Sequence, residues 1–174
     1  WYSLLLALGT TIITLLSAYP FAFFLARLPK GVQRILLLLM IIPFWTSSLI
    51  RTYALIILFK ANGIINTLLL YLGLIHEPIM MLYTQSAVFI GLVYTLLPFM
   101  VLPIYSSIQK LDWRLIEAAR DLGATSKNIF FHIILPLNLP GIVAGSTMVF
   151  LPALGLFYIP DILGVARVML IGDR

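Results

Sequence analysis

Cysteine is absent from the 174 residues, so the chain forms neither a disulfide nor a thiolate metal site. Its two histidines, His76 and His132, stand far apart, and no pattern of clustered metal ligands is present. The chain also lacks a phosphate-binding glycine loop ending in Lys-Ser or Lys-Thr. Because paired carboxylates and an activated nucleophile are likewise missing from the apolar segments, we predict no catalytic residue and no metal.

Charge is scarce as well. Charged residues make up 10% of the chain and hydrophobic residues 62%, whereas about a quarter of the residues in a soluble domain are charged. This composition predicts an integral membrane protein surrounded by lipid. The net charge of +5 comes from lysines and arginines between apolar segments, where the positive-inside rule places them. We therefore predict no binding to nucleic acid.

Long stretches without charge indicate the membrane spans, because a helix needs about 20 apolar residues to cross a bilayer. We predict four spans, at about residues 1–26, 35–55, 80–106 and 141–160. Arg51 falls near the end of the second, and we expect that helix to continue through Tyr53 with the guanidinium reaching outward. Five prolines within the spans predict kinked helices: Pro20, Pro43, Pro98, Pro103 and Pro152.

Two basic loops orient these spans. Residues 27–34 and 107–140 carry most of the Lys and Arg, and both are predicted to face the cytoplasm. An even number of crossings must then separate them, so 61–75 is interpreted as a short interfacial helix on the outer face. The N-terminus and the tail after 160 lie outside in this scheme. The chain begins at Trp1 and stops soon after a span, and we interpret it as a fragment.

The second basic loop has the pattern of a helical hairpin. Asp112 is placed to cap a first helix, and Gly123 follows its last residue, where a left-handed conformation favours glycine. Thr125 or Ser126 caps a second helix, which Pro136 is expected to end. Apolar residues at helical spacing predict one stripe along the first helix: Leu111, Leu115, Ile116, Ala119 and Leu122.

The same hairpin contains a longer pattern: Glu117-Ala118-Ala119, three residues, Gly123, nine residues, then Ile133-x-Leu135-Pro136. This pattern resembles the EAA motif of binding-protein-dependent ABC importers. The resemblance implies that 109–136 forms coupling helices that dock into a cytoplasmic ABC ATPase dimer. ATP would be bound and hydrolysed by that ATPase, which makes this chain a translocation subunit without a cofactor. Two simpler interpretations stay open: a solvated hairpin without a partner, and a Glu117 that only pairs with Arg114 or Arg120.

A second resemblance concerns the substrate. Residues 43–54, 62–66 and 151–161 are similar to the spermidine/putrescine branch of this family. The resemblance implies an all-α membrane protein, a polytopic bundle of the type I ABC importer permease fold. Family members have six spans, of which four are present here and the flanking ones are missing. It also implies a second permease subunit, a periplasmic or extracellular substrate-binding protein, and a place in the bacterial cytoplasmic (inner) membrane.

Polyamines are flexible polycations, which carboxylates and aromatic faces attract. We predict four residues of the substrate pathway: Trp45, Tyr53, Tyr158 and Asp161. Trp45 and Tyr53 are eight residues apart and would share a helical face. Other roles stay open: core packing for Trp45, an interfacial place for both tyrosines, and helix capping for Asp161. One hypothesis pairs Asp161 with Arg51, and the substrate competes for that pair.

Other functions remain open. Importers of iron, phosphonate or opines share the hairpin but should differ around Trp45–Tyr53 and Phe157–Asp161. A passive channel subunit has no need of an amphipathic cytoplasmic hairpin. The sequence Gly141-x-x-x-Gly145 opens the fourth span and could pack against the second permease. The sequence does not distinguish spermidine from putrescine.

Overall fold

The structure is a computed structural model that describes residues 2–73, 75, 77–79 and 84–155. Every regular element in these residues is helical, which confirms the predicted all-α class. The elements in chain order are α1 (Tyr2–Arg27), α2 (Lys30–Ile41), the 3₁₀ turn η1 (Ile42–Trp45), α3 (Ser48–Phe59), α4 (Ile64–Tyr71), α5 (Gln85–Gln109), α6 (Trp113–Asp121), α7 (Ser126–Ile129), the π-helical segment η2 (Phe130–Ile134) and α8 (Leu135–Gly155).

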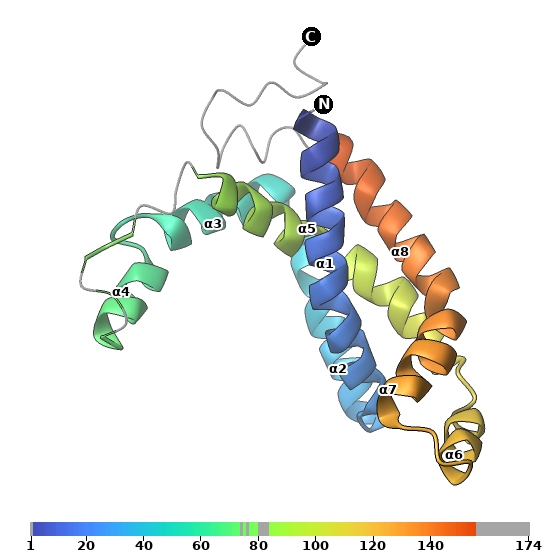
Figure 1. The fold of residues 1–174 in the computed structure, drawn as a ribbon. Helices are drawn as coiled ribbons and strands as arrows, with labels where there is room; N and C mark the ends of the chain where they lie inside the picture. The colour runs from blue at the N-terminus through green and yellow to red at the C-terminus, as the bar shows by residue number, and fades with distance from the viewer. Residues whose placement is uncertain (1, 74, 76, 80–83, 156–174) are drawn as a thin grey trace.

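Helices α1, α5 and α8 pack on one another and form the main bundle (Figure 1). Small residues of α1 let α5 approach closely, and α5 supplies most of the large buried side chains. The buried cluster contains Ala7, Ala18, Ala22, Leu96, Met100, Val101, Ile104, Ile108, Val149 and Ala153. Figure 1 shows α6 and α7 at one end of this bundle, and α4 beyond α3, away from it.

Helices α5 and α8 approach each other closely at two glycines. A Cβ on Gly141 would lie 2.5 Å from Ser107 Cβ and 2.8 Å from the Pro103 carbonyl oxygen, and one on Gly145 would lie 2.9 Å from Met100 Sδ. Only glycine allows this separation of the two helices. The glycine pair therefore packs within this chain, and our suggestion that it faces a second permease is wrong.

The segment predicted as the second span is not one helix. Helix α2 ends at Ile41, η1 follows, and Thr46 is extended with φ −86° and ψ 150° before α3 begins. Pro43 has no amide hydrogen to continue the helical pattern, and the Thr46 hydroxyl donates to the Pro43 carbonyl at 2.7 Å. The expected continuous helix from 35 through Tyr53 is therefore wrong, whereas the span boundaries remain predictions.

Four helical stretches within the described residues are long and apolar enough to cross a membrane. They are Ser3–Arg27, Leu49–Tyr71, Ser86–Gln109 and Ser126–Gly155. The second of them covers α3 and α4, with a turn at 60–63 between the two helices. A short interfacial helix was expected within 61–75; α4 is a short helix there, and its place at the outer interface stays a prediction. Buried Asn66 holds its surroundings in place, since its amide donates to the Lys60 and Ile79 carbonyls and accepts from Ile79 N.

The fourth long helix begins earlier than predicted, because Pro136 does not end α7. Helical structure runs from Ser126 through η2 into α8. The proline lies in the first turn of α8, and the amide of Leu135 bonds five residues back to the Phe130 carbonyl. This wider π turn makes room for the pyrrolidine ring, which would otherwise collide with the preceding turn.

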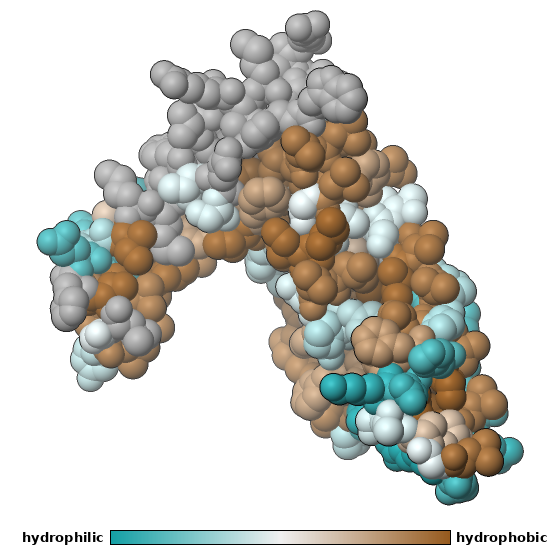
Figure 2. All heavy atoms as spheres, in the orientation of Figure 1, coloured by the Kyte–Doolittle hydropathy of each residue, from teal (hydrophilic) through white to brown (hydrophobic). Residues whose placement is uncertain are grey.

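The two basic loops lie at the same end of the bundle. Gln33, in the first turns of α2, contacts Tyr105 and Gln109 at the end of α5, and α5 leads directly into the hairpin. Figure 2 shows hydrophilic residues gathered at this end, over α6 and α7, and hydrophobic residues over the sides of α1 and α8. We call it the basic end of the bundle.

We predict that Gly141→Ala destabilises the protein by about 1–3 kcal/mol, because the added methyl group would overlap α5 backbone and side-chain atoms. Thermal unfolding in detergent micelles measures the effect. Gly31→Ala is the matched control, since a Cβ on Gly31 has nothing within 4 Å. Equal unfolding temperatures for the two variants would contradict the close approach of α5 and α8.

Candidate functional site: a capped hairpin at the basic end of the bundle

The hairpin between α5 and α8 is built from the capping residues that the sequence predicts. The Asp112 carboxylate accepts the amide of Arg114 at 3.0 Å, and the Thr125 hydroxyl accepts the amide of Asn128 at 3.4 Å. Gly123 has φ +80° at the turn between them. These three local features begin α6, reverse the chain and begin α7.

The predicted apolar stripe divides into two faces. Leu111, Ile116, Ile129 and Ile134 are buried together in a small core, against which Phe23 of α1 also packs. Leu115 and Leu122 point elsewhere and are exposed, Leu122 by 88%. The expectation of a single stripe was therefore wrong: part of it closes the hairpin, and the remainder is an unburied apolar surface.

The motif residues are distributed over these two faces. Glu117, Ala118 and Pro136 are exposed, whereas Ala119, Ile133 and Leu135 are half-buried. Within the part of the chain that the structure describes, Glu117 forms no ion pair with Arg114 or Arg120. Phe131, which precedes the motif's Ile133, is 60% exposed and stacks edge-on against Phe130 with the ring centroids 5.2 Å apart.

Helix α1 holds the hairpin through aromatic contacts that sequence reasoning missed. Trp113 lies 6.4 Å from the Phe23 ring, and the Arg27 guanidinium covers both rings at 4.3 Å from Phe23 and 5.7 Å from Trp113. Further along, Tyr19 meets Phe130 edge-on at 5.8 Å. These contacts tie the start of α6 and the start of η2 to the last turns of α1.

The turn between α1 and α2 is fixed to α5 by a polar cluster around buried Gln33, which sequence reasoning also missed. The Gln33 amide donates to the carbonyls of Ala26 at 3.1 Å and Leu28 at 2.6 Å. Its Oε1 accepts from the Tyr105 hydroxyl at 2.7 Å and from Gln109 Nε2 at 2.9 Å. Gln33 is 7% exposed, and it satisfies one of the carbonyls that the end of α1 leaves open as well as the Leu28 carbonyl in the turn.

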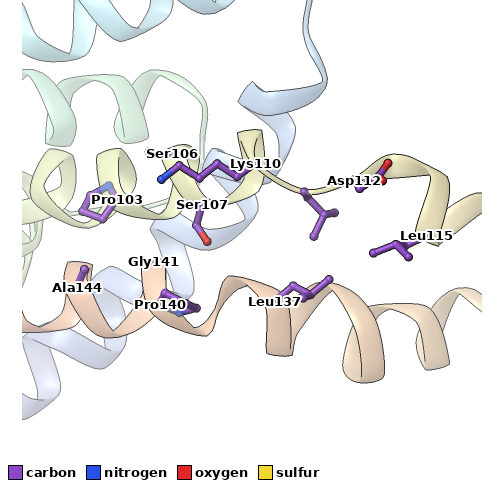
Figure 3. A pocket seen from close by; sticks show the side chains of 11 residues that line it. Pro103, Ser106, Ser107, Lys110, Asp112, Leu115, Leu137, Pro140, Gly141 and Ala144 are labelled. Atoms are coloured by element: carbon purple, nitrogen blue, oxygen red, sulfur yellow. The ribbon is translucent and has the colours of Figure 1, made fainter.

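A groove of about 630 Å³ opens beside the hairpin, between the end of α5 and the start of α8 (Figure 3). Its lining is mostly apolar, with Lys110 and Asp112 at the connection to α6. Leu115 and Leu137 extend into it from opposite sides in Figure 3. The groove continues the exposed apolar surface of the hairpin toward the membrane-spanning part of the bundle.

The predicted pathway residues are only partly described. Trp45, at the end of η1, is 88% exposed, and Tyr53 in α3 is 59% exposed, so neither packs in the core of this chain. The break at Thr46 separates them, and the argument from shared helical spacing is wrong. Tyr158 and Asp161 lie outside the described residues, and the hypothetical Arg51–Asp161 pair lies outside them too.

Arg51 does not reach outward as expected. It lines a cavity of about 230 Å³ with residues from the end of α2, from η1 and from the middle of α5. The guanidinium carbon is 4.7 Å from the centroid of the Phe44 ring. That ring meets Phe99 of α5 edge-on at 5.2 Å.

The family model described as "binding-protein-dependent transport system inner membrane component" matches residues 18–173. The chain belongs to this family, a class of multi-pass inner-membrane permease components, as the EAA pattern predicted. It is 56% identical over 172 residues to the spermidine/putrescine transport system permease protein PotB of Salmonella typhimurium, covering 99% of this chain and 60% of that relative. PotB of Escherichia coli K12 is equally similar, with 62% of its length covered.

A more distant relative is the inner membrane ABC transporter permease protein YdcU of Escherichia coli K12. It is 32% identical over 93% of this chain and 56% of its own length. The chain thus spans about 60% of the length of the PotB relatives that it matches.

We predict that Gly123→Val loosens the hairpin turn, because a β-branched residue at φ +80° costs about 1–3 kcal/mol. A Cβ on Gly123 has no atom within 4 Å, so this cost comes from the backbone conformation and not from a steric clash. Amide hydrogen exchange across 113–134 should accelerate about tenfold for exchange through local opening. Gly123→Asn is the control, since asparagine tolerates the left-handed region. Equal exchange in both variants would show that the turn does not depend on this conformation.

Proposed function

We propose that this chain is a permease subunit of an ATP-driven ABC importer that carries polyamines from a substrate-binding protein to the cytoplasm. The capped hairpin with an exposed apolar face at the basic end of the bundle is the observation on which the proposal mainly rests. An unburied apolar surface of this kind favours a protein partner. The names of the 56% identical relatives support the substrate class.

In this proposal the hairpin docks into one subunit of a cytoplasmic ATPase dimer. The exposed side chains of Leu115, Leu122 and Phe131 supply the apolar contact, and Glu117 supplies a charge at its edge. Ala118 allows a close approach of the ATPase surface. ATP is bound and hydrolysed by the ATPase, and this chain supplies no catalytic group.

Displacement of the docked hairpin would reach the bundle by two routes. The first is the covalent one, through η2 into α8. The second passes through the contacts of Trp113 and Phe130 with α1. Because α1 is in turn bonded to α5 through Gln33, the three helices of the bundle would respond together, which suits alternating access between two permease subunits.

Aromatic and acidic residues would line the polyamine path. Trp45 and Tyr53 present exposed rings that attract ammonium groups through the ring quadrupole. Tyr158 and Asp161 are assigned to the same path from the sequence alone. The second permease subunit would supply the opposite wall.

We predict that cells carrying the complete transporter take up labelled spermidine and that unlabelled putrescine competes, whereas iron and phosphonate do not. Asp161→Asn should raise KM for spermidine about tenfold, since a charge-assisted contact to an ammonium group is lost. Uptake that is indifferent to polyamines would refute the substrate class. Unchanged KM in Asp161→Asn would remove that residue from the path.

We predict that Leu122→Asp abolishes uptake while leaving the amount of protein in the membrane unchanged. The residue is 88% exposed, so the fold tolerates a carboxylate that the apolar docking contact does not. Co-purification of the ATPase with the permease measures docking directly. Leu122→Met keeps an apolar side chain and should retain both activities; if Leu122→Asp also retains the ATPase, the hairpin is not the docking surface.

A further inference from the structure

Arg51 lies at the depth of the middle of a membrane-spanning helix. The cavity that it lines is bounded by Tyr94, Leu97 and Pro98, and these residues stand near the centre of α5 (Gln85–Gln109). Leu39 and Met40 bound it on the α2 side. An arginine at such a depth is costly unless water or a counter-charge reaches it, and intramembrane charges therefore mark functional positions.

No counter-charge reaches Arg51 within the described part of the chain. Its Nε is buried without a hydrogen-bond partner there, and the guanidinium lies over the Phe44 ring, 4.7 Å from its centroid. Of the four described carboxylates, Asp112, Glu117 and Asp121 belong to the hairpin at the basic end, and Glu77, beyond α4, forms no ion pair with Arg51. An aromatic face attracts a cation but carries no net charge, so the guanidinium keeps its positive field.

Apart from Arg51 and Tyr94 the cavity has an apolar lining, so the polar groups that would hold water there are the backbone carbonyls freed by its prolines. Two prolines line the cavity, Pro43 and Pro98, and each removes a backbone hydrogen bond from its segment. Backbone that is irregular at membrane depth is tolerated where it faces protein or a water-filled path. The 3₁₀ break at η1 lies directly beside the cavity, and exposed Trp45 ends it.

We propose that Arg51 is an electrostatic barrier in the translocation path, which keeps small monovalent cations from leaking through the transporter at rest. This inference rests on the proposed function, since it requires a water-filled path for cations at this depth. A fixed positive charge in a narrow, poorly screened passage repels every cation that approaches it. A polyamine differs from K⁺ because one of its ammonium groups can replace the guanidinium on the Phe44 ring while the aromatic rings and the carboxylate assigned to the path attract the others.

The test measures passive K⁺ flux through the complete transporter in proteoliposomes, with a K⁺ gradient and with neither ATP nor polyamine present. Arg51→Gln removes the charge and keeps a polar side chain, and we expect the flux to rise about tenfold. Arg51→Lys is the matched control that keeps the charge, and its flux should stay within about twofold of the wild type.

Three results would overturn the barrier. Flux through Arg51→Gln equal to that of the wild type would show that the charge does not limit leakage. Equal leakage through both variants would assign the effect to packing. If the Arg51→Gln variant fails to assemble into the transporter, whether or not the Arg51→Lys variant assembles, Arg51 makes a structural contact instead. Because the assay contains no polyamine, the K⁺ flux can be interpreted even if the transporter carries another solute. Spermidine uptake by the wild type tests the proposed function independently.

Discussion

The contact between α5 and α8 is the constraint on which the arrangement of the other elements depends. Gly141 and Gly145 bring the two backbones so close that no side chain fits between them. This contact sets where α8 starts relative to the end of α5, and the two ends carry the hairpin between them. Apolar solvent provides no hydrophobic force that would hold helices together, so close van der Waals packing of this kind has to supply the stability.

The hairpin was largely predictable because its determinants are local. Asp112 and Thr125 bond backbone amides two and three residues away, and Gly123 acts through its own φ, so these features are readable from the sequence. The division of the apolar stripe into a buried and an exposed face was not predictable. Whether Leu115 or Ile116 is buried depends on where α7 and η2 pack against α6. Periodicity identifies apolar positions and leaves their partners open.

The contacts of Gln33 and the position of Pro136 within a continuous helix were also not predicted from the sequence. The bonds of Gln33 to Tyr105 and Gln109 join residues more than 70 positions apart, and nothing in the neighbourhood of a lone glutamine predicts them. Pro136 was expected to end a helix, which is the usual consequence of its missing amide hydrogen. Instead, the π turn before Pro136 makes room for its ring, and the helix continues into α8. The substrate-pathway assignment rests on a motif and on spacing, and the break at Thr46 removed the spacing.

Because the helical run Ser126–Gly155 is unbroken, a movement of the hairpin at its start also displaces its far end. Thirty residues at the α-helical rise give a rod about 45 Å long. A tilt of about 5° would move its far end by roughly 4 Å, comparable to the width of an ammonium group. The π turn near the hairpin and the two prolines inside α8, Pro140 and Pro152, are the points at which such a rod bends most easily, so their stiffness sets how much of any movement at α7 arrives at the opposite membrane face.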